Sequence, residues 1–417
     1  MVMLSVNLNR NPPWSSGTPF EILKALGGAD KTMIVGGAVR DWLSDEPVED
    51  IDFATKLLPK KAMQILLDSG FNVKPTGIDH GTITVYRDNK SYEITSLRKD
   101  IITDGRHAKV LFGGTWEEDA NRRDFTVNAL YSDEYGSILD FTGLGFKDLE
   151  NKKLRFIGNP TKRIKEDYLR LLRYFRFLSR FLDNIDSNSL NACIQCAKKL
   201  NLLSSERLLL ELNKIFISKN SDIVLDKMIK NNVFVNIFLP VSINNYKLKN
   251  NLLKKLLFKF KDCKNRTNYP FILYISFVIA LLPQKTTNKK TIVSLTIKKF
   301  KLSNNDKRLL VRNTDWLLDI ENINKIKIIK LWLDFGQSDI QDLKDILLIN
   351  NNKIKKDLMY ILNNPPPNFP VSGNDLLNIG LKEGKEVGDK LNEIRDWWID
   401  MECKPSYKEC LSKVTKI

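Results

Sequence analysis

Histidine, cysteine and long apolar runs are all scarce in this chain of 417 residues. Its longest apolar run, Phe271 to Leu282, lies between two prolines and is too short to span a membrane, so we interpret it as a buried core helix. Five cysteines are an odd number for a long chain, which favours a reducing compartment. The first residues contain no basic or arginine-rich targeting pattern, so we expect a cytoplasmic protein.

The cysteine pattern does not indicate a zinc site. Cys193 and Cys196 form a lone CxxC pair, and a structural zinc ion needs a second pair of cysteines or histidines nearby. The chain has two histidines, His80 and His107, and neither is near that pair in the sequence. We therefore expect Cys193 and Cys196 to be small apolar residues packed one helical turn apart.

The charge of the chain is unevenly distributed. Its net charge is +16, yet residues 1–150 hold only 17 of the 66 basic residues and 23 of the 50 acidic ones. The acidic front could hold cations, and the basic remainder could bind a polyanion such as RNA. An abundance of lysine and asparagine without any binding role explains the basic part equally well.

Apolar periodicity changes along the chain from mixed to helical. Residues 31–37 predict a strand that ends at two glycines, and the alternation in GTITVYRDNKSYEITSL predicts a hairpin around Asp88 and Asn89. From about Arg163 the spacing is almost wholly helical. The proline-rich residues 363–373 predict a linker before a last helical segment.

Three glycines recur every fourth residue in that last segment, at Gly380, Gly384 and Gly388. This spacing would place them on one helix face. An RNA backbone or another helix could then approach that face closely, and both readings stay open.

The stretch MIVGGAVRDWLSDEPVEDIDFAT combines two features that suit a nucleoside triphosphate. A strand that ends in Gly36-Gly37 and turns into a helix lets backbone N–H groups approach a phosphate. Asp50 and Asp52, two apart on a strand, project from one face, and such close carboxylates repel each other unless a cation lies between them. Magnesium fits best because it prefers hard oxygen ligands and keeps phosphate oxygens as partners, which suits two-metal nucleotidyl transfer.

A third carboxylate often accompanies such a pair, and Glu93 in SYEITSLR is the best candidate. It lies in the middle of a predicted strand, where a charge otherwise costs burial energy. The alternative is an exposed residue of the hairpin.

Several further motifs resemble, in order and spacing, those of the nucleotidyltransferase family that comprises the class II CCA-adding enzymes and bacterial poly(A) polymerases. The resemblance covers roughly residues 30–215 and is highly specific, and residues 369–394 are similar to the tail of many of these enzymes. The matching segments are VGGAVRDWL, EDIDFAT, PTGIDHGTITV, YEITSLRKDIITDGRHAKV, DANRRDFTVNALY, ILDFTGLGFKDLENKKLRFIG, RIKEDYLRLLRYFRF and SSERLLLEL.

The resemblance implies an α+β fold, with a polymerase-beta-like nucleotidyltransferase head (a small mixed sheet with helices) followed by an all-helical neck, body and tail. The corresponding segments are residues 1–145 for the head, 146–215 for the neck with base recognition, 216–362 for the basic body and 363–417 for an RNA-binding tail. Some relatives carry a phosphohydrolase domain built on clustered histidines, and the absence of histidine after residue 107 argues against one here.

In this family one helix reads the base of the incoming nucleotide, and the matching stretch contains Glu166, Asp167 and Arg170. Asp167 and Arg170 are three apart, so we expect them on one helix face, with Glu166 orienting Arg170 and Arg173 as a further contact. Aspartate accepts hydrogen bonds and arginine donates them, which matches the amine and ring nitrogen shared by cytosine and adenine. Uracil and guanine would leave two mismatches of about 1–3 kcal/mol each, or roughly 100-fold discrimination. A surface helix with salt bridges is the alternative.

The motif RRDFTVNAL is assigned by the resemblance to triphosphate and ribose contacts. Arg123 is the better phosphate clamp because of its planar fork, and Asp124 and Asn128, four apart on a helix, are sugar partners. Arg40 is interpreted as a phosphate or base-side contact, with Asp41 stabilising its helix.

Arg106 and His107 lie in a polar loop that the resemblance ties to the switch from C to A addition. A surface loop without that role is an equal alternative.

These features predict a transferase that uses two Mg²⁺ ions to add CCA to the 3′ end of tRNA from CTP and ATP, without a template, releasing pyrophosphate. The expected partners are the tRNA acceptor arm and the two nucleotides, with no membrane and no DNA. The alternatives are a poly(A) polymerase, a partial enzyme adding only CC or only A, and a non-catalytic RNA-binding protein on a decayed head. The intact Asp50, Asp52 and Glu93 argue against decay.

Overall fold

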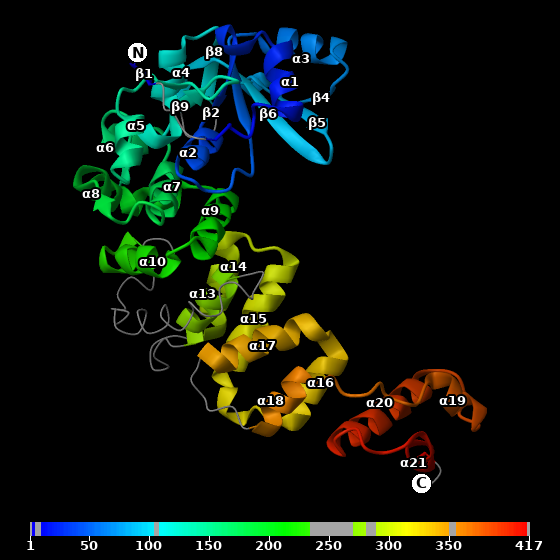
Figure 1. Ribbon diagram of the computed structural model, residues 1–417. Coiled ribbons are helices and arrows are strands. Elements are labelled where there is room, and N and C mark those ends of the chain that lie inside the picture. The colour runs from blue at the N-terminus through cyan, green and yellow to red at the C-terminus, as the bar shows by residue number, and fades with distance from the viewer. Residues whose placement is uncertain are drawn as a thin grey trace. The chain divides into compact units, whose positions relative to one another are not determined.

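The computed structural model of the chain divides into two compact units, Met1–Leu239 and Pro240–Ile417 (Figure 1). The first unit contains a mixed sheet with helices, and the described part of the second contains helices and no strand. The structure describes residues 2–4, 10–103, 108–233, 270–280, 289–349 and 356–414.

Eight strands of the described first unit form one sheet in the order β1-β10-β9-β2-β3-β6-β5-β4. Neighbouring strands are antiparallel except β3 and β6, which run parallel. The strands are β1 (Val2–Leu4), β2 (Thr32–Val35), β3 (Asp52–Thr55), β4 (Asn72–Gly77), β5 (Thr82–Arg87), β6 (Lys90–Ser96), β9 (Leu130–Ser132) and β10 (Ile138–Asp140), while β7 (Arg98–Thr103) and β8 (Ala108–Phe112) pair with each other.

The predicted hairpin is confirmed as β5 and β6. Asp88 and Asn89 form its turn with φ of 52° and 58°, the positive values that a two-residue type I′ turn requires. This turn fixes the register, so that Thr84 pairs with Glu93. The predicted strand before the double glycine is confirmed as β2.

Alternating residues of the central strands divide the core between the two faces of the sheet. Ile34 and Phe53 pack with side chains of α1 and α3 on one face, and Met33, Val35 and Ala54 pack with α4 on the other. Burial on both faces explains the continuous apolar run of β2. These helices are α1 (Gly17–Ala25), α3 (Pro59–Asp68) and α4 (Trp116–Arg122), and α2 (Gly37–Leu43) follows β2.

The helical part of the first unit begins near residue 160, as the apolar spacing predicts. Helix α7 is amphipathic, with Leu171, Phe175 and Leu178 buried and Arg170 and Arg173 at partly exposed positions. The remaining elements are α5 (Gly145–Glu150), α6 (Pro160–Glu166), α7 (Leu169–Leu178), α8 (Ser187–Cys196), α9 (Ser205–Ile217) and α10 (Ser221–Lys230), with β11 (Lys153–Leu154) and β12 (Asn184–Ile185) forming a short parallel pair.

Cys193 and Cys196 are buried and free on α8, which confirms their interpretation as packed apolar residues. Burial raises the pKa of both thiols, so neither is an activated nucleophile.

The predicted buried helix of the second unit is confirmed as α13 (Pro270–Ala280), whose residues 271–279 are buried; the end of the apolar run lies outside the described residues. No helix in the described part of the chain is long and apolar enough to cross a membrane. The other helices of this unit are α14 (Lys289–Phe300), α15 (Asn304–Leu318), α16 (Lys325–Phe335), α17 (Gln337–Ile349), α18 (Lys356–Asn363), α19 (Gly373–Asn378), α20 (Lys385–Asp400) and α21 (Tyr407–Ser412).

The proline-rich linker is confirmed as an irregular segment between α18 and α19. The prediction that Gly380, Gly384 and Gly388 share a helix face is wrong. Gly380 follows α19 with φ 102°, and Gly384 is the N-cap of α20 with φ 142°. Glycine at these two positions permits the backbone to leave one helix and enter the next.

The predicted fold class, an α+β head followed by helices, is confirmed. The division into head, neck, body and tail stays a prediction.

Candidate active site

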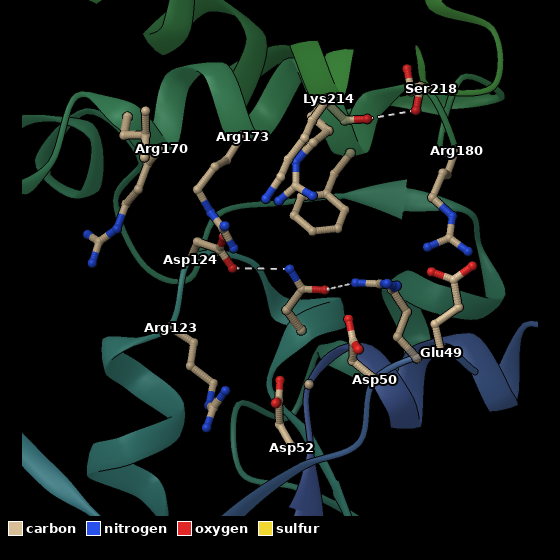
Figure 2. Close-up of a pocket in the computed structure, with 18 of the residues that line it drawn as sticks. Glu49, Asp50, Asp52, Arg123, Asp124, Arg170, Arg173, Arg180, Lys214 and Ser218 are labelled. Atoms are coloured by element: carbon tan, nitrogen blue, oxygen red, sulfur yellow. Dashed lines mark hydrogen bonds and ion pairs between the residues drawn. The ribbon is translucent and has the colours of Figure 1, made fainter. Parts of the chain in front are cut away.

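One pocket of about 950 Å³ in the first unit is lined by the predicted catalytic and nucleotide-binding residues with the exception of Glu93 (Figure 2). Glu166, predicted to orient Arg170, is also absent from its lining. Its walls come from the glycine turn before α2, the segment before β3, the segment after α4, and helices α7 and α9. Nine basic and six acidic side chains are among its described lining residues. This positive balance suits a polyanionic ligand, with the acidic residues at one end available for cations.

The double glycine forms the turn between β2 and α2. Gly36 has φ 79° and ψ −123°, a conformation that favours glycine, and its N–H donates to the Leu130 carbonyl at 3.1 Å. A Cβ at position 36 would stand 3.6 Å from Nη1 of Arg123. A side chain here would therefore fill the space between the turn and the arginine.

Asp50 and Asp52 lie at one end of the pocket (Figure 2). Asp52 is the first residue of β3, but Asp50 precedes the strand, so the expectation of two strand residues is wrong for Asp50. Asp52 pairs with Glu93 of the parallel strand β6, which places both side chains on one face of the sheet. Asp50, Asp52 and Glu93 are all exposed to solvent.

The pKa of Asp52 is raised to about 6. Burial by the pocket walls is the largest cause; the like charge of Glu93 adds to it, and Asp50 adds less, while Arg123 opposes the rise. Water reaches this carboxylate, but the concave wall limits its hydration. The acidic end of the pocket therefore holds negative charge that its protein surroundings do not fully compensate.

The donor set at this end fits magnesium. Within the described residues, His, Cys, Asp and Glu side chains form no group of three or more that could hold a metal ion. An ion held by Asp50 and Asp52 would complete its coordination with phosphate oxygens and water, which is the coordination that Mg²⁺ prefers at phosphate sites. The role of Glu93 as a third ligand stays a prediction.

Asp124 and Asn128 are joined by a hydrogen bond of 3.1 Å from the Asn128 amide to Asp124 Oδ1. Arg173 donates to Asp124 Oδ2 at 2.7 Å, and Arg40 donates to Asn128 Oδ1 at 2.5 Å. Burial opposes ionisation of Asp124, but the charge of Arg173 and the hydrogen bonds from Asn128 and Arg173 lower its pKa below the ordinary value. The predicted residues thus form one connected chain across the pocket floor.

The prediction that Asp124 and Asn128 lie on a helix is wrong. Phe125 forms a β-bridge with Phe156, and the Thr126 N–H donates to the Arg155 carbonyl at 3.1 Å. These long-range backbone bonds keep the segment extended until a single 3₁₀ turn at Thr126–Asn128.

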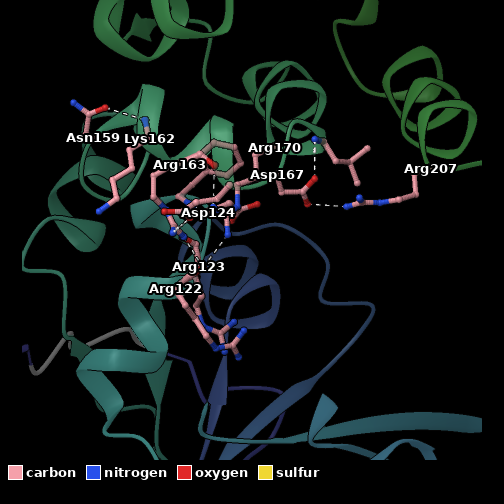
Figure 3. A network of polar contacts seen from close by, with 12 residues as sticks. Arg122, Arg123, Asp124, Asn159, Lys162, Arg163, Asp167, Arg170 and Arg207 are labelled. Atoms are coloured by element: carbon pink, nitrogen blue, oxygen red, sulfur yellow. Dashed lines mark hydrogen bonds and ion pairs between the residues drawn. The ribbon is translucent and has the colours of Figure 1, made fainter. Parts of the chain in front are cut away.

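Asp167 and Arg170 both line the pocket, but the prediction that they share one helix is wrong. Asp167 has extended backbone angles (φ −153°, ψ 108°) and separates α6 from α7. Its carboxylate accepts from the Leu169 N–H at 3.0 Å and from Arg207 at 2.7 Å (Figure 3). Aspartate ends the helix here because its side chain bonds a nearby backbone N–H.

Nη1 of Arg170 donates to Oε2 of Glu166 at 2.6 Å, so Glu166 orients Arg170 as the sequence predicts. Arg163 donates to the same carboxylate oxygen, and both arginines donate to the carbonyl of Arg122 at the end of α4, at 2.5 Å and 3.3 Å (Figure 3). These bonds satisfy a C-terminal carbonyl of α4 and join it to α6 and α7.

Arg40 is buried beneath the pocket, with its guanidinium 5.0 Å from the ring centroid of Phe177. It donates to both oxygens of Asp41, at 3.0 Å and 2.9 Å, and Arg180 pairs with the same carboxylate at 2.7 Å. Asp41 therefore joins α2 to the end of α7, beyond the role within its own helix that the sequence suggests.

Sequence reasoning gave no role to several residues of the site. Arg207 of α9 belongs to SSERLLLEL, a segment quoted only for its resemblance, and Glu211 there pairs with Arg176 at 2.5 Å. Asp119 and Tyr131, which hold Arg123, were also given no role. The spacing of Asp119 and Arg123, four apart, is a local signal of an ion pair, whereas the contact of Tyr131 joins a strand to a helix. Arg106 and His107 lie outside the described residues.

Two family models match the chain, "Poly A polymerase head domain" over residues 32–155 and "Probable RNA and SrmB- binding site of polymerase A" over residues 184–242. The human protein named CCA tRNA nucleotidyltransferase 1, mitochondrial, is 33% identical over 390 residues, which cover 92% of this chain and 86% of the relative. The chain belongs to the CCA-adding nucleotidyltransferase family.

Solved structures of the family agree with this fold. The Bacillus stearothermophilus CCA-adding enzyme in complex with CTP has a TM-score of 0.65 and 25% identity, covering 92% of this chain and 91% of its own. A tRNA nucleotidyltransferase complexed with a primer tRNA and an incoming ATP analog has a TM-score of 0.60 and 20% identity. The match covers 82% of this chain and 96% of that structure's chain. Membership of the CCA-adding nucleotidyltransferase family confirms the predicted family and makes this chain a nucleotidyltransferase.

Proposed function

We propose that this chain adds CCA to the 3′ end of tRNA without a template, using CTP and ATP and releasing pyrophosphate. The observation that carries the proposal is one pocket with Asp50 and Asp52 at one end and an arginine-rich wall from α7 at the other. The names of the relatives support it, since they include a CCA tRNA nucleotidyltransferase and structures with CTP or with primer tRNA and an ATP analog.

The triphosphate would lie between the glycine turn, Gly36 and Gly37, and Arg123, whose Nη1 faces that turn. N–H donors already satisfy Asp124, since it accepts from Arg173, the Asn128 amide and the Phe125 N–H. Asp124 would therefore order its neighbours, and the second amide N–H of Asn128 would contact the ribose.

The base would be read by Asp167 and Arg170, each of which is bonded to a neighbouring side chain. Arg207 holds Asp167 and Glu166 holds Arg170, while Arg173, held by Asp124, closes the side of the pocket. Side chains that are already anchored cannot reorient to match uracil or guanine. Each mismatched polar group then costs about 1–3 kcal/mol, which favours CTP and ATP.

In the proposed reaction, the 3′ hydroxyl oxygen of the tRNA attacks the α-phosphorus in line and its proton passes to solvent. The bond from that phosphorus to the bridging oxygen of the β-phosphate breaks, so pyrophosphate leaves. Asp50 and Asp52 would hold Mg²⁺. When bound, the metal lowers the pKa of the hydroxyl and neutralises the leaving phosphates. Arg123 and the glycine turn hold the phosphates in place for attack.

The acceptor arm of tRNA would be held through its phosphates by the basic residues of the pocket and of segments 216–362 and 363–417, with neither membrane nor DNA as a partner. We propose a cytoplasmic location from the sequence, although the human relative is named mitochondrial. Microscopy of the tagged protein in its native cells decides between the two compartments.

The deciding experiment measures incorporation of single labelled nucleotides, with magnesium, into tRNA lacking its end, tRNA ending in C and tRNA ending in CC. We expect CTP to be added twice and ATP once, with UTP and GTP refused. Long A tracts would instead identify a poly(A) polymerase, the function after which the matching head model is named. Use of CTP without ATP, or of ATP without CTP, would identify a partial enzyme. No incorporation together with salt-sensitive tRNA binding would leave a non-catalytic RNA-binding protein.

A further inference from the structure

The guanidinium of Arg123 has one edge anchored and one edge directed at the glycine turn. Nη2 donates to Oδ2 of Asp119 at 2.8 Å, and Nε lies 3.1 Å from the same oxygen and 3.2 Å from the hydroxyl of Tyr131. Nη1 lies 3.6 Å from the place a Cβ of residue 36 would occupy. Figure 2 shows Arg123 extending from the segment after α4 toward the side of the pocket that holds Asp52.

The anchor of Arg123, formed by Asp119 and Tyr131, is rigid. The Tyr131 hydroxyl donates to Asp119 Oδ2 at 2.6 Å, and both side chains are buried, 0% and 1% exposed. The Tyr131 ring makes edge-to-face contacts with Trp116 and Phe141, at centroid distances of 5.5 and 5.2 Å, which fix its orientation.

The anchor is also in register with the glycine turn. Tyr131 on β9 pairs with Val35 on β2, the residue before Gly36, and the Gly36 N–H donates to Leu130. The residue that holds the arginine and the turn that faces it therefore lie on neighbouring strands. Their separation is set by backbone hydrogen bonds.

We propose that Tyr131 and Asp119 are positioning residues that hold Arg123 in the orientation that grips the triphosphate of the incoming nucleotide. This inference rests on the proposed function, in which Arg123 contacts those phosphates. A long arginine side chain loses conformational freedom when it binds a ligand, and an arginine fixed beforehand loses less, so the anchor strengthens binding of every triphosphate equally.

Both members of the anchor keep one protonation state near neutral pH. Burial raises the pKa of the Tyr131 phenol, so it remains a donor. Burial opposes ionisation of Asp119, but the charges of Arg123 and Arg122 lower its pKa to about 2, so it remains an acceptor. The anchor therefore persists over the whole range in which the enzyme would work.

The test compares Tyr131→Phe with the matched control Tyr174→Phe. Tyr174 is also fully buried, but its hydroxyl has no hydrogen-bond partner among the described residues. Equilibrium binding of CTP, ATP and cytidine is measured for each variant, together with the thermal midpoint. We expect Tyr131→Phe to weaken CTP and ATP binding about three- to tenfold, the value of one hydrogen bond, with cytidine binding unchanged. Tyr174→Phe should change none of the three.

A double mutant separates positioning from general stabilisation. If Tyr131 acts through Arg123, Tyr131→Phe should have no further effect on CTP binding in an Arg123→Gln background. Additive effects, equal loss of cytidine binding, or equal effects of the two tyrosine variants would each overturn the inference, as would a wild-type chain that binds no CTP. A chain that binds CTP but does not transfer CMP would refute the proposed function alone, since the binding comparison does not depend on turnover.

Discussion

Asp52 of β3 lies directly opposite Glu93 of the parallel strand β6, with both side chains on one face of the sheet. After burial, the charge of Glu93 is the largest cause that raises the pKa of Asp52 to about 6. A proton and a cation compete for the same carboxylate. We therefore expect nucleotide incorporation at limiting Mg²⁺ to fall as the pH drops through about 6, because Asp52 becomes protonated.

The measurement is a set of pH profiles of CMP incorporation at several Mg²⁺ concentrations. Saturating Mg²⁺ should move the acid limb to lower pH, since the ion favours the ionised carboxylate. An acid limb that does not respond to Mg²⁺ would show that a group other than the proposed ligand controls it.

Glu93→Gln should move the same acid limb to lower pH, because it removes a negative charge that raises the pKa of Asp52. The midpoint of the profile is the readout, since the maximum rate also falls if Glu93 takes part in catalysis. Glu21→Gln, which removes an exposed charge paired with Arg87 elsewhere in the same unit, is the control and should leave the midpoint unchanged. A midpoint that rises in Glu93→Gln would contradict the coupling.

Asp52→Asn and Asp50→Asn should each reduce incorporation by roughly 100-fold or more, since metal-based charge stabilisation is worth several kcal/mol. Binding of tRNA should be nearly unchanged, because these carboxylates contribute no attraction to RNA phosphates. Filter binding and single-turnover incorporation on the same preparations give the two numbers. Parallel losses of binding and turnover would point to misfolding.

Arg207→Ala should weaken discrimination against UTP and GTP by roughly tenfold, because Asp167 loses the partner that fixes its carboxylate. The ratio of kcat/KM for CTP to that for UTP measures this effect. Arg87→Ala, which breaks an exposed ion pair with Glu21, is a matched control outside the pocket. An unchanged ratio in Arg207→Ala would mean that Asp167 keeps its orientation through its bond to Leu169 alone.

Affinity for tRNA should fall at least about tenfold between about 50 and about 200 mM salt, because phosphate contacts release counterions. Replacing any one arginine that contacts a tRNA phosphate should reduce the slope of log affinity against log salt concentration. Arg87→Ala should leave that slope unchanged. A salt-independent affinity would exclude the basic residues as the RNA-binding surface.

Much of the site was predictable because its signals are local. The Gly36 turn, the Asp88-Asn89 hairpin and the apolar run of β2 each depend on residues that are close in sequence. The helix break at Asp167 was missed because the spacing of its neighbours is helical. What ends the helix is a side-chain bond to Leu169, strengthened by Arg207 from another helix.

The extended path of Asp124 was missed for a similar reason. Phe125 pairs with Phe156 and Thr126 bonds Arg155, so the backbone follows partners some thirty residues away and not its own propensity. The anchor of Arg123 by Tyr131 likewise joins β9 to α4. Contacts between distant elements leave no periodic pattern, and an isolated sequence cannot indicate them.

The central position of β2 has a consequence for synthesis on the ribosome. Its two neighbours in the sheet are β3, some twenty residues later, and β9, nearly a hundred residues later. Until Tyr131 has emerged, a strand that is apolar on both faces keeps one edge unpaired, a state prone to mispairing and to capture by chaperones. The pocket is completed later still, when α9 adds Arg207, so the proposed nucleotide site is incomplete until most of the first unit has been made.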